Sequence, residues 1–272
     1  MKSAANVEVL IIGNEILTGD ILDTNTNWLC RLVHGRGGCV TRVTIVPDVL
    51  KVVSQAIRDA VARKVDILFT SGGLGPTSDD LTLQAVADGT DRKVVLHEVA
   101  LEQVRQQYDH FFEQGIMTQG GLNPARQKMA CLPLGGEPLL NPVGTAPGVF
   151  LQVEKTAIIC VPGVPSELKG IIEQSLQPFL DQVFGEGEAM SRCVAVTCND
   201  ESLLEPVLIR IVEDYPDIYT KSLATTIGEN PEMDIIMTIS GIGEKLSILE
   251  KAFDELCAGI VDLGFSITRK SI

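Results

Sequence analysis

Short apolar runs and stretches with helical spacing alternate along the first part of the chain. Three runs rich in β-branched residues, each of which predicts a buried strand, occupy 7–12, 40–46 and 65–70. Apolar residues at three- and four-residue spacing predict helices after Asp23-Thr24-Asn25, after Pro47-Asp48 and from about Leu81 to Ala87. Because strand and helix alternate three times, the pattern predicts a parallel sheet with right-handed crossovers.

The same pattern continues to residue 184. A long helix is predicted at 98–116, and the polar stretch Thr118 to Lys128 follows it, which we interpret as a lid or an oligomer arm. Strands are predicted at 149–153 and 156–161, followed by a helix that runs to about Phe184. Residues 1–184 are therefore expected to form one domain, a doubly wound, mostly parallel α/β sheet.

A polar, glycine-interrupted segment, Gly185-Glu186-Gly187-Glu188, marks the predicted domain boundary. Beyond it, the pattern predicts strands at 193–198, 217–222 and 233–239 and helices at about 200–214 and 244–263. Residues 185–272 are therefore expected to form a second, smaller α+β domain, in which we find no catalytic constellation.

Composition and charge narrow the classes of partner. The chain has 272 residues, 45% of them hydrophobic, and a net charge of −14 from 36 acidic and 22 basic residues. Nucleic-acid binding depends on Lys and Arg contacts to phosphate, so we expect no nucleic-acid partner. No apolar stretch approaches the ~20 residues of a membrane helix, the first residues lack the apolar region of a signal peptide, and the cysteines form no C-x-x-C pair. These features predict a cytoplasmic protein without membrane contact. Three cysteines within apolar runs, Cys160, Cys193 and Cys198, are expected to be small core residues.

The glycine-rich loop, a name used here for residues 72–78, follows the predicted strand at 65–70. Its three glycines are Gly72, Gly73 and Gly75. Glycine leaves main-chain N–H groups uncovered, and a helix start follows, so the loop is a candidate anion site. Asp79 and Asp80 come next, and they would repel a bare phosphate, which indicates a bridging metal, a protonated group or a polar ligand such as a ribose or pterin. For Asp79 alone, the alternative is a helix N-cap.

Ligands of such sheets bind outside the carboxyl ends of the parallel strands. The loops at these ends are Gly13 to Gly19, Pro47-Asp48 and Gly72 to Asp80, and we expect them to converge on one pocket. The segment Gly163 to Ser166 is a second candidate anion contact, with an ordinary proline-initiated helix start as the alternative.

Four segments dense in Gly, Pro and polar residues follow one another along the chain. They are Gly13-Asn14-Glu15-Ile16-Leu17-Thr18-Gly19 with Asp23-Thr24-Asn25, Gly72-Gly73-Leu74-Gly75-Pro76-Thr77-Ser78-Asp79-Asp80-Leu81-Thr82, Asn141-Pro142-Val143-Gly144-Thr145-Ala146-Pro147-Gly148, and Pro162-Gly163-Val164-Pro165-Ser166-Glu167. Through them, residues 7–184 resemble the MoaB/Mog family of molybdopterin-binding domains, and most closely the amino-terminal part of competence/damage-inducible CinA-type proteins. Residues 190–272 more weakly resemble the small KH-like domain that follows it in those proteins.

The resemblance implies a doubly wound sheet and a pocket for a pterin or a nucleotide phosphate. It matches two essential aspartates of Mog-type proteins to Asp48 and Asp80, and it implies the metal-dependent cleavage of ADP-ribose to AMP and ribose 5-phosphate known for CinA-type proteins. Asn14 stands where many relatives have an aspartate, which shifts a metal-ligand role in the first loop to Glu15. The amidohydrolase domain of full-length CinA is not among residues 1–272, so deamidation of nicotinamide mononucleotide is not transferred.

We therefore expect a metal-dependent hydrolase of a nucleotide pyrophosphate such as ADP-ribose. Asp48 and Asp80 are its expected catalytic residues, and a divalent Mg, Mn or Co ion is expected on Asp80 with Asp48 or Glu15. The expected ligand-binding residues are Gly13, Asn25, Gly72, Gly73, Gly75, Thr77, Ser78, Arg126, Lys128, Gly144, Thr145, Gly163 and Ser166. For Arg126 and Lys128, the alternative is a solvated surface pair.

Two other functions stay open at this point. One is a molybdopterin-binding protein of molybdenum-cofactor biosynthesis, which would bind the pterin or transfer an adenylyl group with the same carboxylates. The other is a non-catalytic, oligomeric module that binds a nucleotide. In each case the expected partner is a small nucleotide or pterin, and the resemblance implies a homo-oligomer.

Overall fold

The computed structural model describes residues 5–185, 188–226, 231–241 and 244–270, which divide into two compact units. The first consists of Met1–Val33 and Gly38–Phe184, and the second of His34–Gly37 and Gly185–Ile272. Of the segment predicted as the boundary, residues 186 and 187 lie outside the described residues. Each unit has its own hydrophobic core.

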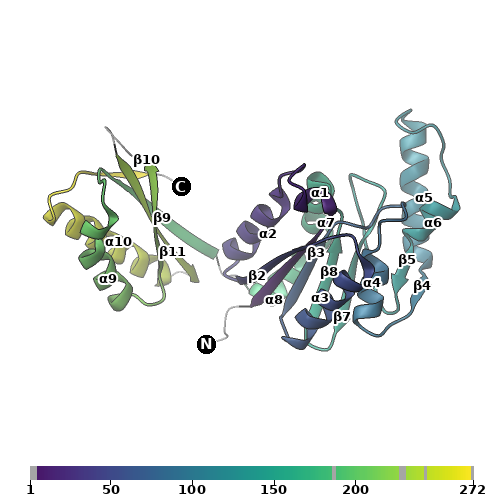
Figure 1. Ribbon diagram of the computed structural model, residues 1–272, viewed down its shortest axis with the longest axis horizontal. Coiled ribbons are helices and arrows are strands. Elements are labelled where there is room, and N and C mark those ends of the chain that lie inside the picture. Colours follow the sequence, from purple (N-terminus) through teal and green to yellow (C-terminus); the bar gives the residue numbers. More distant parts are fainter. Residues whose placement is uncertain (1–4, 186–187, 227–230, 242–243, 271–272) are drawn as a thin grey trace. The chain divides into compact units, whose positions relative to one another are not determined.

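A six-stranded sheet forms the centre of the first unit (Figure 1). Its strands, in spatial order, are β2 (Cys39–Val46), β1 (Asn6–Ile12), β3 (Ile67–Ser71), β8 (Thr156–Val161), β7 (Gly148–Val153) and β6 (Glu137–Leu139). The first four are parallel neighbours, and β7 and β6 are added in antiparallel pairs. The predicted mostly parallel sheet is thereby confirmed. Strand β6 was not predicted, because a three-residue strand carries no readable alternation.

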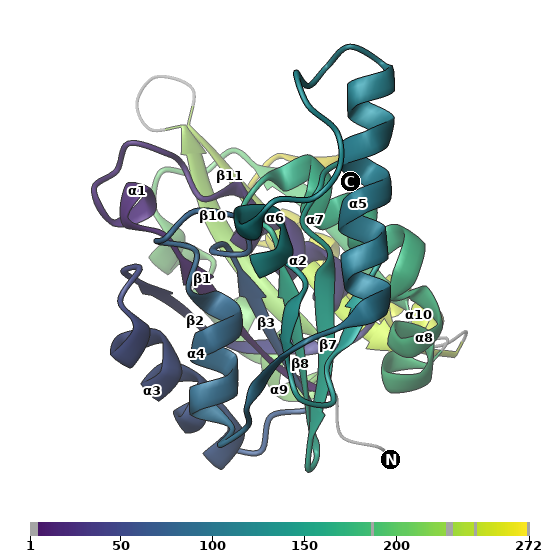
Figure 2. The same cartoon turned by 90° about the vertical axis from the view of Figure 1, so that its right-hand side faces the viewer.

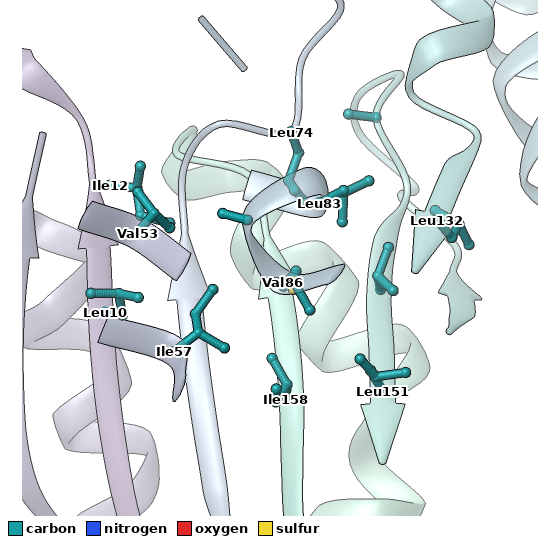
Figure 3. Close-up of a cluster of buried hydrophobic side chains, with 14 of the residues drawn as sticks. Leu10, Ile12, Val53, Ile57, Leu74, Leu83, Val86, Leu132, Leu151 and Ile158 are labelled. Carbon is teal, nitrogen blue, oxygen red and sulfur yellow. The ribbon is translucent and has the colours of Figure 1, made fainter. Parts of the chain in front are cut away.

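Helices cover both faces of this sheet, as Figure 2 shows. One face packs against α3 (Leu50–Ala62), α4 (Thr82–Gly89) and α5 (Glu98–Glu113), and the other against α2 (Thr24–Gly35), α7 (Pro165–Ser175) and α8 (Gln177–Phe184). Successive residues of a strand point to opposite faces, so Leu10 and Ile12 of β1 join the first cluster (Figure 3), and Val9 and Ile11 join the second. The unit is therefore doubly wound, with two cores.

Two local predictions were wrong in detail, and a third stretch contains elements that the sequence did not predict. The loop predicted after the first strand contains a short helix, α1 (Asn14–Leu17), whose first N–H donates to Asp48. The helix predicted to run to Phe184 is broken between α7 and α8, because Pro178 supplies no N–H to the carbonyl four residues before it and its ring crowds that carbonyl. The stretch predicted as a lid or arm contains α6 (Pro124–Lys128) and leads into β5 (Cys131–Pro133), which pairs antiparallel with β4 (Val94–Leu96).

The second unit is a smaller α+β domain, as predicted, and its sheet is antiparallel. Its strand order is β10 (Tyr219–Thr226), β11 (Glu232–Gly241), β9 (Glu188–Val196) and β12 (Ile267–Lys270). The 3₁₀ helix η1 (Glu201–Leu203) precedes α9 (Glu205–Asp214), and α10 (Glu244–Asp262) packs with α9 and the sheet around one core. The sequence did not predict β12, a strand that pairs with β9 and whose Lys270 forms ion pairs with Glu232 and Asp234 of β11. The described helices include none with the length and apolar character that a membrane span requires.

Candidate functional site

A cavity of about 590 Å³ opens at the carboxyl ends of β1 and β3. The chain passes from β1 to β2 on one side and then to β3 on the other, so this is the point where the direction of winding reverses. The neighbouring strands diverge in their connections there, which leaves room between the loops for a ligand.

The structure brings nine of the residues listed from the sequence to the wall of this cavity. They are Glu15, Asn25, Asp48, Gly72, Gly73, Gly75, Asp80, Thr145 and Gly163. The other seven lie outside the lining, although several of them contact residues that form it. These seven are Gly13, Thr77, Ser78, Arg126, Lys128, Gly144 and Ser166.

The glycine-rich loop needs glycine at its first two positions. Gly72 has φ +110°, and a Cβ on it would lie 2.1 Å from the carbonyl oxygen of Ile12. Gly73 has φ +67°, and a Cβ there would lie 2.4 Å from Thr82 Oγ1. Thr82 in turn donates its hydroxyl to the Gly72 carbonyl and its N–H to the Gly73 carbonyl, at 2.7 and 3.1 Å. The end of β3, the loop and the start of α4 therefore form one closely packed turn.

Thr77 holds both carboxylates that follow the loop. Its hydroxyl contacts Asp79 Oδ1 at 2.5 Å and Asp80 Oδ2 at 2.6 Å, and its N–H donates to Asp80 Oδ2 at 2.8 Å. The hydrogen bond from Thr77 lowers the pKa of Asp79, which is exposed. The alternative role of Asp79 as a helix cap is wrong, because Leu81 is the N-cap of α4 and no side chain caps it.

Asp48 and Glu15 reach the cavity from two other loops. Asp48 Oδ2 accepts the N–H of Asn14 at 2.8 Å, which ties the loop after β2 to the start of α1. The carboxylate of Glu15 lies over Gly13, where a Cβ would be 2.5 Å from Glu15 Oε1. Within the described part of the chain, however, no three or more His, Cys, Asp or Glu side chains gather closely enough to form a metal site by themselves.

Asn25 links three parts of the cavity wall. Asp23 caps α2 through the N–H of Thr26, at 2.9 Å, which confirms the predicted capping sequence and places Asn25 in the first turn. Asn25 is buried, and its Nδ2 donates to the carbonyl of Gly163 at 2.7 Å and to Ser71 Oγ at 3.0 Å. Ser71, at the end of β3, donates onward to the carbonyl of Pro162. Ser71 was not predicted as a site residue, because a serine at the end of a buried strand belongs to no recognisable motif.

Glu167 and Asn141 form a further pair at the cavity, and the sequence did not predict either residue as part of the site. Asn141 Nδ2 donates to Glu167 Oε2 at 2.7 Å and to the carbonyl of Ala146 at 2.8 Å, and its Oδ1 accepts the N–H groups of Val143 and Gly144. Burial raises the pKa of Glu167, which lines the cavity. Both residues belong to the segments dense in Gly, Pro and polar residues, but no local sequence pattern indicated that their side chains would contact each other.

The two basic residues predicted as ligand contacts, Arg126 and Lys128, donate hydrogen bonds to loop carbonyls. The guanidinium of Arg126 donates to the carbonyls of Gln119, Gly120 and Gly121, and it lies 3.8 Å from the centre of the Tyr108 ring. Lys128 donates to the carbonyl of Thr77 and lines a smaller cavity of about 240 Å³ beside the glycine-rich loop. Arg126 therefore stabilises the stretch before α6, and Lys128 stabilises the glycine-rich loop.

Comparisons with known proteins agree with this architecture. A family described as a probable molybdopterin binding domain matches residues 8–182. A protein of Pyrococcus horikoshii is 38% identical over 208 residues, which cover 76% of this chain and 80% of that protein, and one of Thermococcus kodakarensis is 34% identical over 252 residues, which cover 90% and 99%. Among solved structures, the protein CinA of Thermoplasma acidophilum, described as of unknown function, aligns with a TM-score of 0.59 at 34% identity, over 65% of this chain and 98% of that chain.

Proposed function

Because this chain belongs to the family of probable molybdopterin binding domains, with a CinA-like structure, we propose that its cavity binds a nucleotide pyrophosphate such as ADP-ribose and hydrolyses it to AMP and ribose 5-phosphate. The observation that carries the proposal is that Asp48 and Asp80 line the same cavity as the glycine-rich loop. A pyrophosphate needs hydrogen-bond donors for its oxygens and a positive counter-charge for its hydrolysis. The loop offers the donors, and the two carboxylates could hold a divalent cation that supplies the counter-charge.

Free main-chain donors in the glycine-rich loop support the phosphate position. Among the described residues, the N–H groups of Gly73, Leu74 and Gly75 donate to no acceptor of the protein. Three successive N–H groups without a partner form a concave site that favours an anion. The chain's own contribution would be to hold the phosphates there, with Thr82 and Thr77 fixing the two ends of the loop.

The carboxylates fit a divalent cation that is shared with the substrate. Asp48 and Asp80 each hold a hydrogen bond at Oδ2, which orients the carboxylate and leaves Oδ1 outside these contacts. Such hard oxygen donors suit Mg²⁺ or Mn²⁺, and Mg²⁺ is commonly held by one or two carboxylates together with substrate phosphates. This arrangement also agrees with the absence of a three-residue metal cluster in the described chain. When bound, the ion would neutralise phosphate charge and acidify a water molecule.

Pterin binding is the second candidate function. The observation that favours it is the apolar part of the wall, to which Ile21, Leu22 and Met129 contribute. Ile21 and Leu22 are exposed, so a flat ring could cover apolar surface that water now contacts. Fluorescence of a pterin that copurifies with the full chain would support this candidate.

The test of the main proposal is product chromatography with ADP-ribose and Mg²⁺, Mn²⁺ or Co²⁺. The wild-type chain is expected to release AMP, and Asp80→Asn and Asp48→Asn to lose about 100-fold or more of this activity, because each loses a negative charge that would hold the divalent cation. Glu173→Gln is the matched control, since Glu173 is exposed on α7 and lies outside the cavity lining. If wild type forms no more AMP than Asp80→Asn with any of the three metals, hydrolysis is excluded as the function.

A further inference from the structure

Glu167 is a polar group of the cavity that the proposed chemistry leaves unused. Its half-buried carboxylate is held at Oε2 by Asn141, and its Oε1 accepts no hydrogen bond among the described residues. The carboxylate rests on the bare face of Gly144, where a Cβ would lie 2.2 Å from Glu167 Cδ. The local packing therefore fixes an acceptor in the wall of the cavity.

The contacts of Asn141 fix the orientation of its amide, and thereby the position of the Glu167 carboxylate. Asn141 Oδ1 already receives the N–H groups of Val143 and Gly144, so its amide nitrogen must face Glu167 and the carbonyl of Ala146. A phosphate is not expected here, because Glu167 carries the negative charge at the start of α7, and Pro165, the first residue of that helix, has no N–H. This end of the cavity suits a ligand group that donates hydrogen bonds.

A second unmatched acceptor lies beside the same turn. Asn25 is 93% buried, and its Oδ1 has no hydrogen-bond partner in the described structure. Its amide cannot be reversed, since the oxygen would then face the carbonyl of Gly163 at 2.7 Å. A buried carbonyl oxygen without a donor is unfavourable.

We propose that Glu167, positioned by Asn141, is the specificity-determining residue of this cavity and accepts hydrogen bonds from paired donors on the non-phosphate part of the ligand. Two ligand groups have this chemistry, the vicinal hydroxyls of a ribose and the amino–imino edge of a pterin. The inference rests on the proposed function, because that proposal assigns the phosphates to the glycine-rich loop.

The experiment is calorimetric titration of the full chain with three probes in Mg²⁺, namely ADP-ribose, 6-hydroxymethylpterin and pyrophosphate. In Glu167→Gln, the side chain has one acceptor, which Asn141 occupies, so its NH₂ group would meet the donors of the ligand. If the ribose hydroxyls are the donors, we expect at least a tenfold loss of affinity for ADP-ribose. If the pterin edge supplies the donors, we expect the same loss for 6-hydroxymethylpterin. Pyrophosphate is expected to bind at wild-type affinity or more tightly, because a negative charge has been removed.

Glu173→Gln, in the same helix, is the matched control and should bind every probe as wild type does. The proposal is overturned if Glu167→Gln binds ADP-ribose and the pterin at wild-type affinity, or if pyrophosphate loses as much affinity as they do, which would indicate a distorted cavity. It is also overturned, together with the proposed function, if wild type binds neither organic probe. Selective weakening of ADP-ribose binding without any release of AMP by wild type would contradict hydrolysis and leave this inference standing.

Discussion

The cavity contains two carboxyl sites whose surroundings differ. At the glycine-rich loop, Asp79 and Asp80 are held by short contacts from Thr77, and the pKa of the exposed Asp79 is lowered. At the start of α7, Glu167 is half-buried against Gly144, and desolvation raises its pKa. The exposed carboxylate of Asp79 is in contact with water, whereas Glu167 presents a fixed acceptor that is partly shielded from water.

This difference indicates that the two carboxyl sites would bind different parts of a ligand. Hydrated carboxylates can accept a metal ion and phosphates, because charge can be exchanged there without a large desolvation cost. A desolvated carboxylate with one committed oxygen selects neutral donors instead, since an unmatched partner leaves it unsatisfied. The two ends of a ligand would thus be distinguished by the solvation of the acids that meet them.

The largest expected effect is on stability, from Gly144→Ala. Its new Cβ would lie 2.2 Å from Glu167 Cδ, and the half-buried carboxylate cannot move without breaking its hydrogen bond to Asn141. We expect a loss of about 1–3 kcal/mol in the free energy of unfolding, measured by urea titration of the full chain. Gly75→Ala is the counterpart at the other site and should cost less than about 1 kcal/mol, because its Cβ would lie 2.6 Å from Asp80 Oδ2, a smaller overlap than at Gly144.

The double variant Gly144→Ala/Glu167→Ala isolates the cause. With the carboxylate absent, the added methyl group has room, so the two substitutions should be clearly non-additive. A purely additive pair would show that Gly144 is needed for another reason, and the proposed packing of Glu167 would then be wrong.

An intermediate effect is expected from Thr77→Val. This substitution keeps the shape of the side chain but removes the hydroxyl from Asp79 and Asp80, and the N–H contact to Asp80 stays. Because the Thr77 hydrogen bond is the main cause of the lowered pKa of Asp79, that pKa should rise toward its usual value in a carbon-13 NMR titration. Hydrolysis, where present, should fall about tenfold, as for the loss of one hydrogen bond to a charged group.

Thr77→Ser serves as the control, because it retains the hydroxyl. If Thr77→Ser raises the pKa of Asp79 as much as Thr77→Val does, the hydroxyl is not what holds this site.

The smallest expected effect is a pH dependence of stability from Glu167. Its folded-state pKa lies above the unfolded value, so the folded chain binds more protons between the two values. The stability that this group contributes is therefore present below the usual glutamate pKa of about 4.3 and is lost as the pH rises through the raised value. Relative to Glu167→Gln, the melting temperature of wild type should decline over this window in a series of thermal scans.

Glu173→Gln should leave the pH profile unchanged, since Glu173 is exposed and lies outside the cavity lining. A profile of wild type that runs parallel to that of Glu167→Gln would mean that Glu167 is as well solvated as the aspartates, and the comparison between the two sites would fail.

The sequence by itself determined the elements and the positions of most loops that form the cavity. Buried runs at 7–12, 65–70 and 156–161 specify strands through their apolar patterning, and the glycines at 72 and 73 specify a turn with positive φ. Such signals are local, because each depends on neighbours within a few positions. The doubly wound sheet and the cavity at its carboxyl edge follow from them.

Only the tertiary structure decided which polar groups meet in the cavity. Asn25 reaches the carbonyl of Gly163 across 138 positions, and Asn141 reaches Glu167 across 26. Arg126, which the sequence offered as a ligand contact, is taken up by carbonyls and the Tyr108 ring. A side chain's role depends on the donors, acceptors and solvent that packing places around it, and this environment is absent from any local pattern.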